Sequence, residues 1–189
     1  MAKQGKRPIL IPKGANISLE KGSLKISGSQ GTLIFAIPSS ISVTVEKESV
    51  QVGFSGMEKL ENLRGLVHAL IRHRLSAVTE GITKKLEVVG VGYQAEVKGK
   101  DLVLKVGFSH PVPMEVPEGI KVKIEKNIIT ITGIDPEKVG DFSAKVRAVR
   151  PPEPYGGKGV RYFGEYVRHK VGKTAGVGVT GATGTPGSK

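Results

Sequence analysis

The stretch PSSISVTVEKESVQVGFSGMEKLENLRGLVHAL, residues 38–70, shows how the chain is organised, because the chain contains this pattern twice. The second copy, PEGIKVKIEKNIITITGIDPEKVGDFSAKVRAV, occupies residues 117–149 and aligns with the first without a gap. Pro38 coincides with Pro117, two Glu-Lys pairs coincide, and most apolar positions of the two copies agree. An ungapped match over two strands and a helix is not expected by chance. Because there are only two copies, the repeat predicts a duplicated domain and not a solenoid.

Each copy has the pattern of a β-hairpin followed by a helix. In the first copy Ile41, Val43 and Val45 alternate with polar residues, and Val50 and Val52 alternate again after a short polar turn. This period of two predicts a hairpin with one buried face. Apolar residues then recur at spacings of three and four, which predicts an amphipathic helix. In the first copy these residues are Met57, Leu60, Leu63, Val67, Ile71, Leu75 and Val78.

Several shorter alternating stretches precede each hairpin, so each copy combines a run of strands with one helix. This order predicts an α+β fold of two tandem duplicated domains, each an antiparallel sheet with one helix packed on a face. We place the first domain at 1–82, with a basic leader, and the second at 83–173. The remaining stretch, 174–189, is rich in glycine and threonine and is expected to be a flexible tail.

The net charge of +12 is concentrated at two places in the chain. Residues 1–13 contribute +4 and residues 145–173 contribute +6, whereas residues 14–144 are almost neutral. A basic protein of this kind favours polyanions, chiefly nucleic acid, with an anionic membrane as the second choice. A uniformly solvated basic surface does not predict such segregation. The chain has no cysteine and no apolar run of membrane-spanning length, so we expect a cytoplasmic protein.

The segment PPEPYGGKGVRYFGEYVRHKVGK, residues 151–173, is the main candidate for RNA contact. Its glycines allow the backbone to approach a phosphate chain closely, and cations and aromatic rings alternate along it. The alternative is that the rings are core residues under a charged surface, and this is our expectation for Phe163. The candidate RNA-binding residues here are Tyr155, Gly156, Gly157, Lys158, Gly159, Arg161, Tyr162, Arg168, Lys170 and Lys173.

The N-terminal stretch GKRPILIPKG is a second basic element. Pro8 and Pro12 favour an extended backbone, so Lys6, Arg7 and Lys13 could lie along a groove, and Lys6 and Arg7 are candidates for RNA contact. A charged, disordered leader remains the alternative.

Enzyme motifs fail on inspection, so we expect no enzyme, no metal site and no cofactor. Gly90-Val91-Gly92-Tyr93-Gln94-Ala95 fits a loose dinucleotide pattern, but it lies between two expected strands. Gly172-Lys173-Thr174 resembles the end of a phosphate-binding loop, but the required earlier glycine is Val167. His68 and His73 are five residues apart on one expected helix and do not share a face as metal ligands would.

Three stretches resemble the universal large-subunit ribosomal protein six family in its bacterial form. They are GKRPILIPKG, GVGYQAEVKGKDLVLKVGFSHPV at 90–112, and the basic segment 151–173. The resemblance covers about residues 3–173 and implies a structural protein of the large ribosomal subunit. It implies binding to 23S ribosomal RNA, mainly through the second domain, at the stalk base near the sarcin–ricin loop. It further implies two kinds of partner, namely neighbouring ribosomal proteins and the translation factors that dock nearby. It does not imply a membrane.

The resemblance also identifies an RNA-facing stretch, from Tyr155 through Val160 to Tyr162. The family usually has a lysine directly after the tyrosine, where this chain has Gly156, so one phosphate contact is missing or comes from elsewhere.

Two alternatives from other classes remain open. A free-standing, non-specific RNA or polyanion binder would not prefer a folded ribosomal RNA, and an enzyme for a phosphorylated substrate would need a convergent set of catalytic groups.

Overall fold

The computed structural model describes residues 7–20, 22–46, 48–54 and 61–172, and two hydrophobic cores divide them into two halves. The expected tail, 174–189, and the candidate residues Lys6 and Lys173 lie outside the described residues. The first half contains β1 (Ile9–Leu10), β2 (Asn16–Glu20), β3 (Ser23–Gly28), β4 (Gly31–Ala36), β5 (Ile41–Val45), β6 (Ser49–Phe54) and α1 (Glu61–Glu80).

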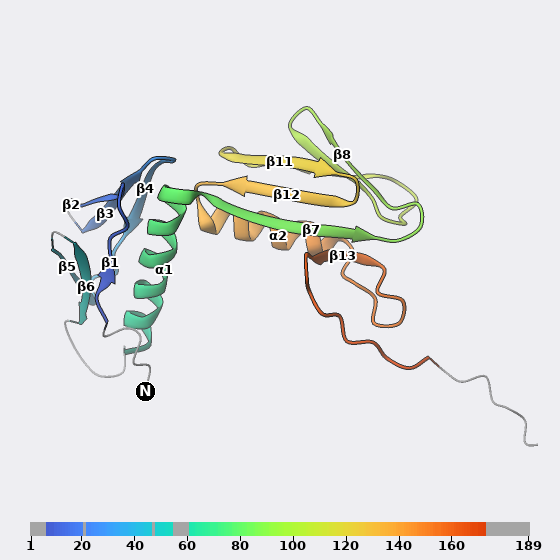
Figure 1. Cartoon of the computed structure of the whole chain (residues 1–189). Coiled ribbons are helices and arrows are strands. Elements are labelled where there is room, and N and C mark those ends of the chain that lie inside the picture. Colours follow the sequence, from blue (N-terminus) through green and yellow to red (C-terminus); the bar gives the residue numbers. More distant parts are fainter. Residues whose placement is uncertain (1–6, 21, 47, 55–60, 173–189) are drawn as a thin grey trace, which may run out of the picture.

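The second half has the same kind of elements with one additional strand. It contains β7 (Ile82–Val89), β8 (Gln94–Lys98), β9 (Asp101–Lys105), β10 (Val112–Glu115), β11 (Ile120–Glu125), β12 (Ile128–Gly133), α2 (Pro136–Val149) and β13 (Gly159–Tyr162). All strand pairs are antiparallel. Figure 1 shows each helix packed against the strands of its own half.

The repeat in the sequence is a repeat in the structure. Val43 pairs with Val52 across the first hairpin, and Val122 pairs with Ile131 across the second, at the positions that the alignment equates. The duplicated α+β architecture is therefore confirmed. Within each half the strands divide between two small sheets, because the three-stranded sheet β10-β9-β8 folds over to bury its own apolar face, as β2-β3-β4 does in the first half.

The helix α2 begins where the sequence predicts. The side chain of Asp135 accepts a hydrogen bond from the backbone N–H of Glu137 at 3.0 Å, and Pro136 occupies the first turn. An N-terminal cap of this kind satisfies a donor that the helix cannot satisfy itself. The buried face of α2, with Val139, Phe142 and Val146, packs on the sheet β11-β12-β7-β13.

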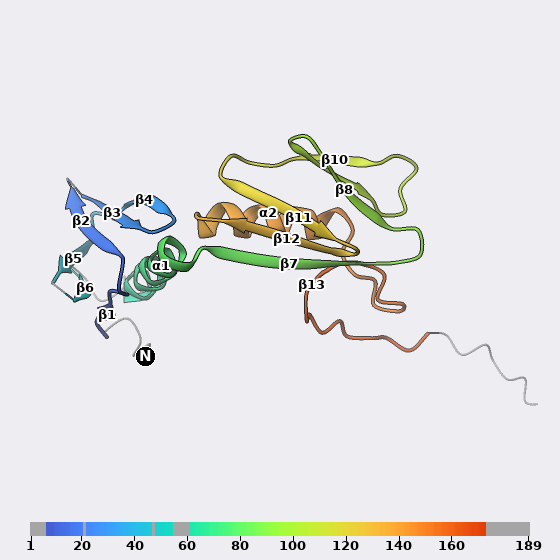
Figure 2. The same ribbon diagram turned by 45° about the horizontal axis from the view of Figure 1, so that its top comes forward.

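The two halves follow one another with a single intervening residue, Gly81, whose φ is +75°. Figure 2 shows β7 leading directly away from the end of α1. Ile134, from the corner between β12 and α2, packs against the core of the first half. This contact brings the second half against the core of the first half.

Candidate nucleic-acid interface

The basic segment begins as a tight loop. Pro151 and Pro152 follow the end of α2, and the chain then turns back so that the N–H of Glu153 donates to the carbonyl of Lys158 at 2.9 Å. The N–H of Gly157 donates to the carbonyl of Glu153 at 2.9 Å, which closes the loop further. The tip of this loop consists of exposed residues, among them Tyr155, whose relative exposure is 57%.

Two of the three glycines serve the fold of the loop. Gly157 and Gly159 are buried and have positive φ, and a Cβ atom on Gly159 would lie 2.7 Å from the Pro151 oxygen and from the Pro152 Cα. Only glycine tolerates both that backbone conformation and that approach. Gly156 is different, because it is exposed and its nearest neighbour would be 3.9 Å from an added Cβ. It is therefore free to carry a side chain.

The end of the basic segment returns to this loop. The backbone N–H of Lys170 donates to the Pro154 carbonyl at 2.9 Å, and the His169 ring lies 3.4 Å from the Tyr155 carbonyl oxygen. These contacts hold the stretch that carries Arg168 and Lys170 against the loop that carries Lys158, and all three side chains are exposed. We name the exposed residues Tyr155, Gly156, Lys158, Arg168 and Lys170 the basic loop surface.

Arg161 lies elsewhere. Its Nε and Nη2 atoms donate to one carboxylate oxygen of Glu87 at 3.0 and 2.9 Å, and both side chains are about 30% exposed. The pairing follows from strand register, since Arg161 on β13 stands opposite Glu87 on β7. Its charge is therefore matched within the protein, and Arg161 is better placed to position β13 than to bind a phosphate.

The exposure of the aromatic residues also differs from the expectation. Phe163, expected in the core, is 61% exposed because it follows β13 on the side of the sheet that faces away from α2. Tyr162 is half-buried instead, and the Arg147 guanidinium lies over its ring at 5.9 Å. A strand alternates its two faces, so the exposure of Phe163 follows from the burial of Val160.

The Glu165 carboxylate anchors the residues that follow β13. Glu165 accepts hydrogen bonds from Arg147 Nε at 3.0 Å, from Arg147 Nη2, and from the backbone N–H of Tyr162 at 2.9 Å. The hydrogen bond from Arg147 lowers the pKa of Glu165, and the same hydrogen bond raises the pKa of Arg147. A carboxylate within the basic segment thus stabilises its conformation against α2.

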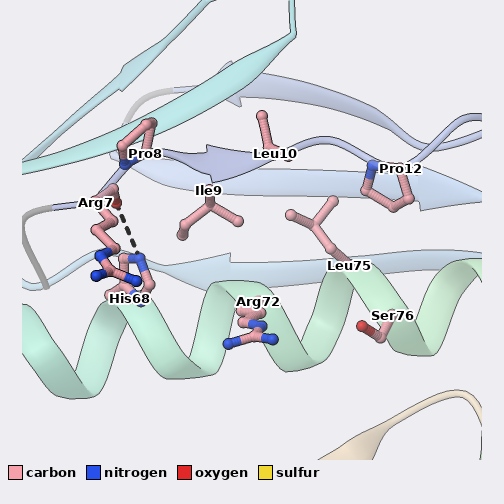
Figure 3. A pocket seen from close by; sticks show the side chains of 9 residues that line it. All are labelled: Arg7, Pro8, Ile9, Leu10, Pro12, His68, Arg72, Leu75 and Ser76. Carbon is pink, nitrogen blue, oxygen red and sulfur yellow. Dashed lines mark hydrogen bonds between the residues drawn. The ribbon is translucent and has the colours of Figure 1, made fainter. Parts of the chain in front are cut away.

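The second basic element lies on the first half. Arg7 contributes to a pocket of about 360 Å³ between β1 and α1, together with His68 and Arg72 of α1 (Figure 3). The His68 Nε2 atom is 3.1 Å from the Arg7 carbonyl oxygen, so this histidine holds the extended N-terminal stretch against the helix. The sequence analysis did not identify Arg72 as a residue of this pocket. Its position four residues after His68, on the same helix face, was the available signal.

Two classes of feature are not found in the described part of the chain. Its acidic side chains and histidines form no group of three that could hold a metal ion. None of its helices is long and apolar enough to cross a membrane.

Comparison with known proteins places the chain in a family. The profile of the family described as ribosomal protein L6 matches residues 89–163. Large ribosomal subunit protein uL6 of Thermosynechococcus vestitus is 45% identical over 184 residues, which covers 92% of this chain and 98% of that protein. The uL6 proteins of Protochlamydia amoebophila and Moorella thermoacetica are 45% and 44% identical, and the alignments cover 93% and 94% of this chain and 98% of each relative.

The chain belongs to the ribosomal protein L6 family. The resemblance seen in the three stretches is thereby confirmed, and it extends over nearly the whole chain. Members of the L6 family are structural proteins, which confirms the expectation that the chain is not an enzyme.

Proposed function

We propose that this L6-family protein is a structural constituent of the cytoplasmic large ribosomal subunit, where it binds and stabilises 23S ribosomal RNA. The observation that carries the proposal is the basic loop surface. Lys158, Arg168 and Lys170 gather there from two segments, and the ion pairs found within the described residues involve none of them. Unpaired, exposed cations beside an exposed tyrosine suit the phosphates and unstacked bases of RNA.

The proposed binding is electrostatic and structural. Each cation that contacts a phosphate releases counterions, so the logarithm of the association constant should fall linearly with the logarithm of the salt concentration. Three described cations contribute a slope of about −2 to −3. Because the loop is closed by backbone hydrogen bonds and Glu165 is anchored on α2, little ordering entropy is lost on binding.

The two halves contribute unequally to the proposed RNA binding. We take residues 1–82 and 83–173 as two domains, with the main RNA contact on the second. The pocket residues Arg7 and Arg72 provide a smaller contact on the first domain, since both cations line one open pocket at its N-terminal end. A position at the stalk base near the sarcin–ricin loop, beside other ribosomal proteins and docking translation factors, rests on the family resemblance.

The decisive experiment removes the three cations of the basic loop surface by Lys158→Gln, Arg168→Gln and Lys170→Gln together. Binding to purified 23S ribosomal RNA and to random RNA of equal length is measured at several salt concentrations. The wild-type protein should prefer the ribosomal RNA, and the triple variant should lose about 2 to 3 from the salt slope.

A matched control replaces three exposed lysines elsewhere on the second half, namely Lys100, Lys105 and Lys138, by glutamine. It changes the net charge equally, and its salt slope should remain close to that of the wild type. Equal binding of both RNAs by the wild type would favour a free-standing polyanion binder. Equal slopes for the triple variant and the wild type would overturn the site.

A further inference from the structure

The sheet β11-β12-β7-β13 has an open face with its own charge pattern. Its other face packs on α2 and carries Leu86, Ile129 and Ile131, all fully buried. Figure 1 looks onto the open face, with α2 behind the strands. Because side chains alternate along each strand, the residues between these buried ones point outward.

Strand register brings three lysines together on this face. Lys123 of β11 pairs with Thr130 of β12, and Thr130 pairs with Lys85 of β7. In the next outward-facing row Lys121 pairs with Thr132, and Thr132 pairs with Thr83. We name these six residues the basic sheet face. Its three lysines are exposed, and each stands beside a threonine hydroxyl.

An aromatic side chain completes the first of these rows. The N–H of Phe163 donates to the Lys85 carbonyl at 2.9 Å, so Phe163 continues the row Lys123–Thr130–Lys85 beyond β7. The ring is 61% exposed. Adjacent strands are about 4.8 Å apart, so the row extends roughly 14 Å across the sheet. It ends at the strand that leads into the basic loop surface.

Carboxylates lie on the same open face but outside the two lysine rows. Glu87 is paired with Arg161, and Glu125 is exposed in the same row as Glu87, across Ile128. The neutral pair Arg161–Glu87 leaves the lysines as the dominant charge in the middle of the sheet. The face therefore presents a strip of positive charge that runs from Lys121 and Lys123 to Lys85 and ends beside Phe163, just beyond β13.

We propose that the RNA held by the basic loop surface continues across the basic sheet face, with phosphates on Lys85, Lys121 and Lys123 and a base or ribose against Phe163. This inference rests on the proposed function. Lysine is depleted at the centre of protein–protein interfaces, and threonine hydroxyls and ammonium groups suit phosphates and 2′-hydroxyls. A single ring at the edge of the sheet offers stacking without a sequence code.

The experiment compares Lys85→Gln, Lys121→Gln and Lys123→Gln together with the Lys100, Lys105 and Lys138 control described above. The salt slope for purified 23S ribosomal RNA should decrease in magnitude by about 2 in the sheet variant. It should stay unchanged in the control, which loses the same net charge but keeps all three lysines of the basic sheet face. Thermal unfolding of both variants should match the wild type, since all six lysines are exposed.

The ring is tested separately. Phe163→Ala should weaken binding about fivefold or more, and Phe163→Tyr should restore it. In the wild-type complex Lys85, Lys121 and Lys123 should also be protected from acetylation, whereas Lys138 should not.

The outcomes separate the two proposals. If the wild type does not prefer 23S ribosomal RNA, the proposed function fails. If it does, but the sheet variant behaves as the control, only the present inference fails. A sheet variant that keeps its RNA slope but no longer sediments with large subunits would assign this face to a protein neighbour and also overturn the inference.

Discussion

Arg74 of α1 and Glu137 of α2 form an ion pair that joins the two halves, with Arg74 Nη2 2.7 Å from Glu137 Oε1. The arginine side chain is 6% exposed and the glutamate side chain 59% exposed. The guanidinium also lies 4.4 Å above the ring of Phe35, and its Nη1 atom is buried without a hydrogen-bond partner. A buried cation therefore depends on one carboxylate from the other half and on one ring.

The first prediction concerns this pair. Glu137→Ala should destabilise the protein by about 1–3 kcal/mol, because it leaves a buried guanidinium without its carboxylate. Arg74→Met should cost less, since a hydrophobic side chain of similar length removes the charge and keeps contact with Phe35. Chemical denaturation measures both. Asp141→Asn, which removes the exposed partner of Lys145, is the control and should cost no more than about 0.5 kcal/mol.

The contradictory result would be an Arg74→Met variant that is much less stable than Glu137→Ala. In that case the cation itself, and not its compensation, would hold the two halves together.

The second prediction is a pH dependence from Glu165. Its pKa is lowered in the folded protein by the hydrogen bond from Arg147, so the ionised form stabilises the fold. That contribution is complete above the unfolded value of about 4.3 and is lost as the pH falls through the lower folded value. Glu165→Gln should therefore be less stable than the wild type at pH 7, and the difference should shrink below about pH 4. Denaturant midpoints at pH 7 and pH 3 test this.

Arg147→Lys is the companion variant. It keeps the charge but loses the two-point geometry of the guanidinium, so part of the stability at pH 7 should be lost. A constant difference between Glu165→Gln and the wild type at both pH values would show that the carboxylate charge plays no part.

The third prediction separates two neighbouring glycines. Gly159→Ala should destabilise the protein by about 2 kcal/mol or more, because φ is +145° and the added Cβ would overlap Pro151 and Pro152. Gly156→Ala is the matched control, since an added Cβ meets nothing closer than 3.9 Å, and it should be nearly neutral. Thermal unfolding of the two variants side by side is sufficient. Equal stability would show that the prolines move aside at little cost.

The fourth prediction places a lysine at position 156, directly after Tyr155. Gly156 is exposed at the tip of the loop, and an added Cβ there would have no atom closer than 3.9 Å. Gly156→Lys should strengthen binding to 23S ribosomal RNA and make the salt slope more negative by about 0.7–0.9. Gly156→Gln, of similar length without the charge, should leave the slope unchanged. If both variants bind as the wild type does, RNA does not reach the loop tip.

The local part of the fold was predictable from particular residues. The alternation of Ile120, Val122 and Ile124 specified a strand and its buried face, and Asp135-Pro136 specified the start of α2. These signals are short in range, because a strand or a helix start depends on neighbours within a few residues. For the candidate site, the sequence indicated which segment carries it but not which of its residues have free side chains.

The roles of single residues within that segment were not predictable. Arg161 was expected on RNA, a role that stays a prediction, and its ion pair with Glu87, 74 residues earlier in the chain, was not foreseen. Phe163 was expected in the core, and it is exposed because Val160 and Tyr162 take the inward side. Which strands become neighbours decides both outcomes, and no local pattern contains that information.

The order of the amino acids was enough to establish the duplicated fold, the two places of excess charge and the family of the chain. The pairing of individual cations with carboxylates emerged from the three-dimensional arrangement. It matched Arg161 and Arg74 with carboxylates and aligned Lys85, Lys121 and Lys123 on one face. The physical reason is that charge is a property of each residue, whereas its compensation depends on distances that only strand pairing and helix packing set.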